Sequence, residues 1–232
     1  MHHLRADIRR FACFLEVLRP CFPRKEARAI LRQLREIMQQ AGRVRDRDIA
    51  LRLLTKLGVP VSGLRFRTER NASAKELGVL LARWLEDGYP VLRAESRDRP
   101  VRKTAVRILP PMSKEFFRRG KHAARDEARA KELHRFRIAA KKFRYTLDSF
   151  EWVYGGSVDG LILQLRRIQK QLGEINDYAS VRRMVSGRKI RAALKRAQRK
   201  KVEQFRRRWA AQFSGADVVR EWMETLRQSK RA

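Results

Sequence analysis

Apolar residues recur at steps of three and four along most of this chain. The pattern opens with Leu4, Ile8, Phe11, Leu15 and Leu18. This spacing places the side chains on one face of an α-helix. No segment shows the alternation of apolar and polar residues that is typical of a half-buried strand. The pattern predicts an all-α fold, a helical bundle in which each helix turns an apolar face, Phe11 included, toward a core.

Prolines and glycines mark the expected helix ends in the first part of the chain. Pro20 and Pro23 are expected to end the first helix and open the second. Gly42 is expected to end the second helix. Residues 58–72 are expected to form a loop, after which Ser73 caps the next helix. The segment 86–101 mixes Gly, Pro and charge and is predicted to be the main linker.

The second part of the chain predicts longer helices. One is expected from about 124 to 154, and another from Ser157 to near Gly173. The chain is then expected to restart at Asn176 or Asp177. The predictions end with an intensely basic helix over 188–213 and a last helix that opens at Asp217.

Two motifs occur twice in the same order. The segment His2–Phe11 matches His134–Phe143, because both read H-x-x-R-x-x-x-[RK]-[RK]-F, at an offset of 132 residues. A G-x-x-x-D motif follows at Gly42 and again at Gly173, at an offset of 131. Repeats of this kind indicate duplication. We therefore predict a single domain, 1–232, built from two similar helical halves of about 1–95 and 96–232 related by a pseudo-two-fold axis.

Charge narrows the class of partner. Lys and Arg number 57 against 25 Asp and Glu, so the formal net charge is +32 for 27.4 kDa. Such an excess repels itself and calls for a counter-charge, which points to nucleic acid, polyphosphate or an anionic membrane surface. A generally basic, solvated surface is the alternative. The hydrophobic fraction of 43% argues against disorder.

The chain shows no signal for a membrane or a secretory route. No apolar stretch is long enough to span a bilayer, and the first residues lack the apolar core of a signal peptide. Cys13 and Cys21 form no metal-like pattern and are expected to be thiols in a reducing compartment. These features predict a soluble, cytoplasmic protein.

The repeated helices carry cations on one face. His2, Arg5 and Arg9 share a face by their spacing of i, i+3 and i+7. The same holds in the second half for His134, Arg137, Lys141 and Arg144. The helices that follow add Arg28, Arg32 and Arg35 in the first half, and Arg166 and Lys170 in the second. Most of these residues lack a carboxylate at the i+4 position of the kind that a salt-bridged solvent face would carry.

These rows of cations suit a phosphate ligand that carries no nucleobases. Arg binds phosphoryl oxygens bidentately, and Lys acts as a mobile point charge. Proteins that bind single-stranded nucleic acid add aromatic side chains on which bases stack. Here Phe11, Phe136 and Phe143 fall on apolar faces, which favours a base-free polyanion over RNA. The basic run 195–201 is either an RNA-binding segment or a solvated helix face.

Catalytic and metal-binding patterns are not evident in the sequence. Neither His2 nor His134 has a His or Cys at i+4 to complete a metal site. Asp46 and Asp177 are expected to cap helices or to pair with a local basic side chain, with a catalytic pair as the alternative. We expect no enzyme activity, no metal and no cofactor.

The residues together resemble the CHAD domain (conserved histidine α-helical domain). The repeated helix starts, the G-x-x-x-D motif and the segment LHRFRIAAKKFRYTLDSF at 133–150 carry the resemblance. It implies two four-helix bundles around a basic central channel, with inorganic polyphosphate as ligand and no catalytic activity of its own. It also implies association with polyphosphate granules. No E-x-E-x-K pattern of an attached triphosphatase domain occurs, which indicates a stand-alone binding domain.

The resemblance implies a set of binding positions. They are His2, Arg5, Arg9, Arg10, His134, Arg137, Lys141, Lys142 and Arg144, with Arg28, Arg32, Arg35, Arg166 and Lys170 from a looser motif. Nucleic acid is expected only as a weaker competitor, and a membrane is not expected as a partner. Two alternatives stay open: an RNA- or ribosome-binding basic helical protein, and a phosphate-transferring enzyme that uses His134 or a carboxylate-bound metal.

Overall fold

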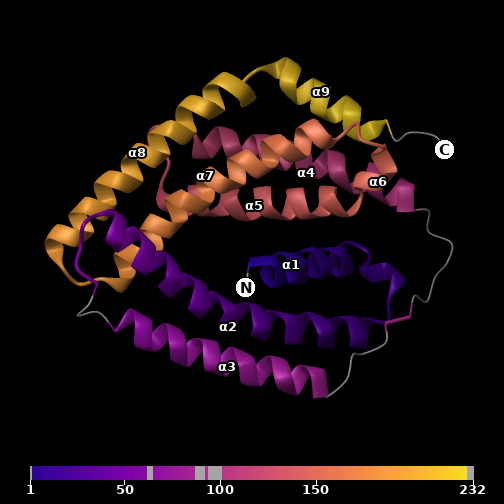
Figure 1. Ribbon diagram of the computed structural model, residues 1–232. Coiled ribbons are helices and arrows are strands. Elements are labelled where there is room, and N and C mark those ends of the chain that lie inside the picture. The colour runs from indigo at the N-terminus through magenta and orange to yellow at the C-terminus, as the bar shows by residue number, and fades with distance from the viewer. Residues whose placement is uncertain (1, 62–64, 87–91, 94–100, 229–232) are drawn as a thin grey trace. The chain divides into compact units, whose positions relative to one another are not determined.

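The structure, a computed structural model, describes residues 2–61, 65–86, 92–93 and 101–228, and the side chains of these residues from Leu4 on. Every element in these ranges is helical, so the all-α prediction is confirmed. The predicted linker 86–101 lies almost entirely outside the described residues. The elements are α1 (His2–Val17), η1 (Arg19–Cys21), α2 (Arg24–Lys56), α3 (Phe66–Glu86), α4 (Val101–Ala123), α5 (Ala130–Ser149), α6 (Glu151–Tyr154), α7 (Asp159–Met184), α8 (Arg188–Phe213) and α9 (Ala216–Arg227) (Figure 1).

The chain forms two compact units. The first comprises Met1–Arg97 and Asp177–Ala197, and the second comprises Asp98–Asn176 and Gln198–Ala232. Both α7 and α8 therefore contribute residues to each unit. The predicted duplication into halves of about 1–95 and 96–232 concerns ancestry rather than packing and stays a prediction.

Two glycines that were expected to end helices lie inside them. Helix α2 is a single helix of 33 residues that passes through Gly42, and α7 passes through Gly173 without a break. Helix α3 begins at Phe66, so the loop predicted over 58–72 is shorter than expected. Packing explains the difference at α2, because buried residues continue from Ile37 to Val44 on both sides of Gly42.

Two apolar clusters lie in the described part of the first unit. In one, Ile8 and Leu15 of α1 pack with Ile30, Leu34 and Ile37 of α2 and with Leu77 of α3. Helix α2 lies alongside both α1 and α3 (Figure 1). In the other, the end of α2 and the start of α3 pack with the ends of α7 and α8 that belong to this unit. Its buried residues include Ile49, Leu54, Phe66, Tyr178, Val181, Val185 and Leu194.

The second unit is built around aromatic rings. Phe116 of α4 is fully buried, and its ring centroid lies 5.2 Å from that of Phe136 and 5.9 Å from that of Phe143 on α5. Trp209 of α8 and Trp222 of α9 lie 5.6 Å and 5.5 Å from the same ring. The predicted core positions of Phe136 and Phe143 are confirmed.

Phe11 departs from its predicted place in the core. Its side chain is 44% exposed, whereas Ile8 and Leu15 of the same helix are buried. The face of α1 that packs on α2 also contains the cation Arg5, which is 7% exposed. The buried stripe of α1 is therefore rotated away from Phe11 toward Arg5.

Candidate phosphate-binding ladders

Helix α5 carries the cationic row that the second copy of the motif predicts. The helix begins after Arg129, whose backbone N–H donates to Glu132 Oε2 at 2.5 Å. Buried side chains at Phe136, Ala140 and Phe143 fix which face turns inward. Around this apolar face the cations occupy the outer side: Arg137 and Lys141 are half-buried, and His134 and Lys142 are exposed.

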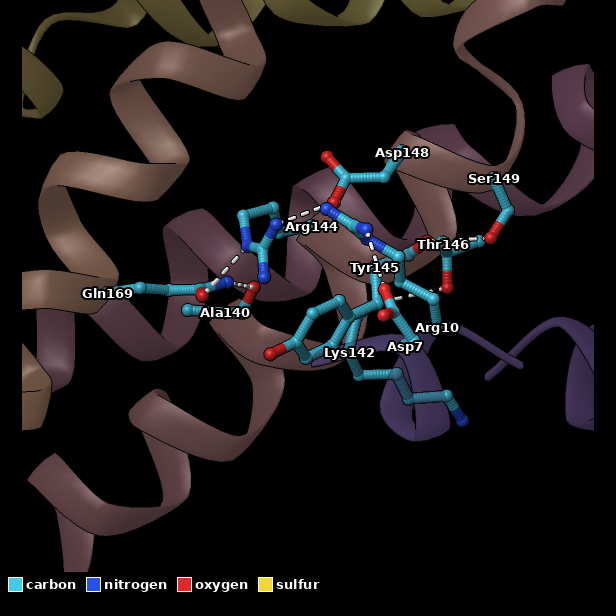
Figure 2. A network of polar contacts seen from close by, with 10 residues as sticks. All are labelled: Asp7, Arg10, Ala140, Lys142, Arg144, Tyr145, Thr146, Asp148, Ser149 and Gln169. Carbon is cyan, nitrogen blue, oxygen red and sulfur yellow. Dashed lines mark hydrogen bonds and ion pairs between the residues drawn. The ribbon is translucent and has the colours of Figure 1, made fainter. Parts of the chain in front are cut away.

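Arg144 departs from the other cations of the row (Figure 2). Only 9% of it is exposed, and its Nη1 donates to Asp148 Oδ2 at 2.5 Å. Its Nε donates to Gln169 Oε1 at 2.8 Å, and its guanidinium carbon lies 4.1 Å from the centroid of the Tyr145 ring. The guanidinium is thus held by contacts within the unit, and its role as a phosphate ligand stays a prediction.

Gln169 links α7 to α5. Besides accepting from Arg144, it donates through Nε2 to the carbonyl oxygen of Ala140 at 2.9 Å (Figure 2). Arg166 precedes Gln169 by nearly one turn and Lys170 follows it directly, and both are exposed. Gln169 thus joins α7 to α5 through two hydrogen bonds within the second unit.

In the first unit, Arg5 packs on Gly42. The position that a Cβ on Gly42 would occupy lies 3.7 Å from Nη1 of Arg5, which is ordinary van der Waals contact. Arg9 is half-buried one turn further along α1, and exposed Arg10 pairs with Asp7 at 3.1 Å. The side chain of His2 lies outside the described residues. The structure thus brings Arg5 of the repeated helix onto the glycine of the second repeated motif.

The row on α2 lies on the exposed side of that helix. Arg28, Arg32 and Arg35 are all exposed. They lie on the side of α2 opposite Ile30 and Ile37, which pack in the cluster shared with α1. Gly42, on which Arg5 packs, follows Arg35 by seven residues and so lies close to the row around the helix, about two turns further along.

Several carboxylates of the described residues are already engaged by other cations. Glu69 and Asp48 pair with Arg47 and Arg70 at 3.2 Å and 3.1 Å. In the second unit a hydrogen bond from Arg118, helped by Arg119, holds the pKa of Glu115 at about 2.

By contrast, seven of the predicted site cations form no ion pair or side-chain hydrogen bond with the residues that the structure describes. They are Arg9, Arg28, Arg32, Arg35, His134, Arg166 and Lys170. Like charges that lie side by side on a helix destabilise it slightly, so an anion that bridges them stabilises the fold.

Asp177 pairs with basic side chains rather than capping a helix. It lies within α7, is 7% exposed, and its carboxylate oxygens lie 3.6 Å from Arg45 Nη2 and 3.9 Å from Arg52 Nη2. The expectation that Asp177 restarts a helix is wrong. Asp177 does pair with basic side chains, but they come from α2 and not from nearby in the chain as predicted. Sequence reasoning missed Asp148 and Gln169. The i, i+4 spacing of Arg144 and Asp148 was a usable signal for the first.

This arrangement defines an all-helical protein with rows of cations on its helices. The family model described as "CHAD domain" matches residues 1–186, and the chain belongs to the CHAD domain family. The crystal structure of the CHAD domain from the plant Ricinus communis is similar in fold. It shares 22% sequence identity at a TM-score of 0.56, over 99% of this chain and 82% of that one.

Two further findings concern the chain. A search against curated protein sequences gives no match. In the part of the chain that the structure describes, no helix is both long enough and apolar enough to cross a membrane.

Proposed function

We propose that this protein binds inorganic polyphosphate through its cationic rows and does not turn it over. The observation that carries the proposal is the set of predicted site cations, Arg9, His134, Arg166 and Lys170 among them, that have no carboxylate partner in the described chain. All of them fall within residues 1–186, the part that matches the family model.

The chemistry of the rows on α5 and α7 favours a ligand without bases. The exposed large hydrophobic side chains of the described residues are Phe11, Val79, Leu85, Ile138, Trp152 and Leu163. Of these only Ile138 lies on α5 and only Leu163 on α7, and neither can stack on a base. The rows on α5 and α7 thus offer charge and hydrogen-bond donors, which is what a chain of phosphates requires. Association with polyphosphate granules in the cytoplasm follows from this proposal.

The experiment is a titration with fluorescently labelled polyphosphate of defined length. The test variant is Arg166→Glu with Lys170→Glu, an exposed i, i+4 pair on α7. The matched control is Lys103→Glu with Arg107→Glu, an exposed i, i+4 pair on α4 of the same unit. Both variants change the net charge equally. We expect the α7 variant to lose more than about tenfold in affinity, because each reversal removes a charge-assisted contact, and the control to lose less than about threefold.

The rows in α5 and α1 are tested in the same assay. Arg137→Glu with Lys141→Glu should weaken binding as strongly as the α7 variant. On α1 the reversal is confined to Arg9, because Arg5 is buried and its reversal would disturb folding. Equal losses in the α4 control would replace the proposal with diffuse electrostatics. Displacement of polyphosphate by single-stranded RNA at equal phosphate concentration would favour an RNA-binding protein instead.

A further inference from the structure

Helix α8 packs against the rest of the protein through one face only. Leu194, Phe205, Trp209 and Phe213 on that side are between 0% and 4% exposed. These residues recur at steps that place them on one face of the helix. The opposite face of α8 is therefore turned to solvent.

The solvent face of the first half of α8 is entirely cationic in its charge. We call it the α8 cation face, and its members are exposed: Arg188, Lys189, Arg191, Lys195, Arg196, Arg199 and Lys200. No carboxylate occurs in α8 before Glu203. None of the seven forms an ion pair or a side-chain hydrogen bond with the described part of the chain.

Cations further along the same helix behave differently. Lys201 pairs with Glu174 at 2.7 Å, and Arg206 pairs with Asp126 at 3.1 Å. Arg206 also donates through Nη2 to the carbonyl oxygens of Arg125 and Asp126. These side chains form ion pairs and hydrogen bonds with other helices and loops of their unit, whereas those of the α8 cation face do not.

The α8 cation face is broad as well as long. At about 100° per residue, Arg191 and Lys189 lie roughly 160° apart around the helix, with Arg188 and Lys195 between them. Arg166 and Lys170 of α7, by comparison, lie only about 40° apart. Along the axis the seven cations span about 18 Å, at about 1.5 Å per residue. A single polyphosphate chain needs only a narrow row of cations, whereas cations spread this widely around a helix reach two separate phosphate backbones.

The α8 cation face offers nothing to lipid tails or to unstacked bases. None of the exposed large hydrophobic side chains in the described ranges lies on α8. A helix that lies in a membrane interface inserts an apolar face, and here that face is buried in the protein. Single-stranded nucleic acid is held by exposed aromatic rings, which α8 does not present to solvent.

The α8 cation face also lies outside the residues that the family model matches. The family model matches residues 1–186, and α8 begins at Arg188. The predicted polyphosphate rows lie before that boundary. The two sets of cations can therefore be separated by mutation.

We propose that the α8 cation face is a second anion site and that its partner is double-helical nucleic acid, contacted through its phosphates without sequence preference. A duplex presents two phosphate backbones on either side of a groove that is wide enough for a helix. Arg and Lys contacts to such phosphates supply non-specific affinity. A helix already fixed on its apolar side presents them with little loss of backbone freedom.

The test uses the full chain and a labelled mixed-sequence DNA duplex of 24 base pairs, a length chosen as roughly two turns of the double helix, followed by fluorescence anisotropy. Arg191→Glu with Lys195→Glu should weaken duplex binding by more than about tenfold and lower the slope of log affinity against log salt by about two. The matched control is again Lys103→Glu with Arg107→Glu, an exposed i, i+4 pair on α4, which should change affinity by less than about threefold.

The α7 variant, Arg166→Glu with Lys170→Glu, separates this inference from the proposed function. It should keep duplex affinity and lose polyphosphate, whereas the α8 variant should do the reverse. Equal losses of duplex binding in the α4 control and the α8 variant would overturn the inference, as would the absence of any duplex binding. Vesicles that contain phosphatidylserine are a further arm, and a larger loss on vesicles than on duplex in the α8 variant would assign the surface to a membrane instead.

Discussion

The ring of Trp209 occupies the space where any side chain on Gly120 would begin. A Cβ on Gly120 of α4 would lie 1.9 Å from Cη2 of Trp209. Trp209 is 4% exposed and stacks on Phe213 with their centroids 5.0 Å apart, so its ring has no room to move. The glycine is therefore required for α4 and α8 to pack in the second unit.

We predict that Gly120→Ala destabilises the protein despite the higher helix propensity of alanine. Overpacking of a buried site costs about 1–3 kcal/mol, and the rigid indole ring places this site at the upper end of that range. The measurement is the free energy of unfolding from urea denaturation followed by circular dichroism.

Gly78→Ala is the matched control. Gly78 lies inside α3, and a Cβ there would meet nothing within 4 Å. This variant should be neutral or more stable by up to about 1 kcal/mol, because alanine is the better helix former. A loss at Gly120 no larger than the change at Gly78 would contradict the packing argument.

The second prediction concerns the ion pair of Arg144 and Asp148. Their side chains are 11% and 8% exposed, so Asp148→Asn leaves a buried guanidinium without its counter-charge. We expect a loss of about 3 kcal/mol in the free energy of unfolding.

Asp7→Asn tests the same chemistry at the surface. Arg10 and Asp7 are 50% and 64% exposed, and a pair of this kind contributes less than about 1 kcal/mol. Similar losses from both variants, measured in the same denaturation assay, would show that Arg144 does not depend on Asp148.

Tyr154 gives a prediction for alkaline pH. Its hydroxyl donates to the carbonyl oxygen of Leu226 at 3.0 Å, and burial raises the pKa of Tyr154 from 10.0 to about 12. The folded state therefore favours the neutral phenol. The stabilisation is complete below pH 10, where the unfolded chain also keeps its proton, and is lost progressively as the pH rises from 10 to 12.

Tyr154→Phe should remove that part of the pH dependence. The variant should lose about 1–3 kcal/mol near neutral pH, because the buried carbonyl of Leu226 loses its donor. Between pH 10 and 12 its stability should fall less steeply than that of the parent chain in thermal unfolding. Parallel curves for the two proteins over that range would refute the assignment.

The proposed function predicts binding that depends on salt and proceeds without turnover. The logarithm of the affinity for polyphosphate should fall linearly with the logarithm of the salt concentration. The slope should be about 0.7 per phosphate contact, by analogy with single-stranded nucleic acid. Incubation with polyphosphate and a divalent metal should release no orthophosphate. Release that is abolished by His134→Ala and retained in Lys195→Ala would show an enzyme instead.

Local signals made the helices predictable, and non-local packing set their limits. The apolar spacing that predicted buried Ile8 and Leu15 is a property of neighbouring turns. Gly42 was misinterpreted as a helix end because a glycine costs a helix only about 1 kcal/mol, which burial along α2 outweighs. Phe11 was misplaced because the stripe of α1 turns toward Arg5, a cation that sequence patterns assign to solvent.

In the candidate site too, local signals were predictable and non-local contacts were not. The spacing of Arg166 and Lys170 indicated an exposed row, and the structure places both at the surface. The partner of Arg144 across the unit, Gln169, lies 25 residues away along the chain, and no local pattern connects the two. Contacts of this kind decide whether a cation in a motif faces a ligand or the interior.

The contribution of α7 and α8 to both units has a consequence for synthesis. Tyr178, Val181, Val185 and Leu194 complete an apolar cluster whose other members, such as Ile49 and Leu54, leave the ribosome more than a hundred residues earlier. The end of α2 must then wait with its apolar side chains uncovered while most of the second unit is translated. A chaperone that shields this segment during translation would protect the nascent chain for longer than an ordinary N-terminal domain requires.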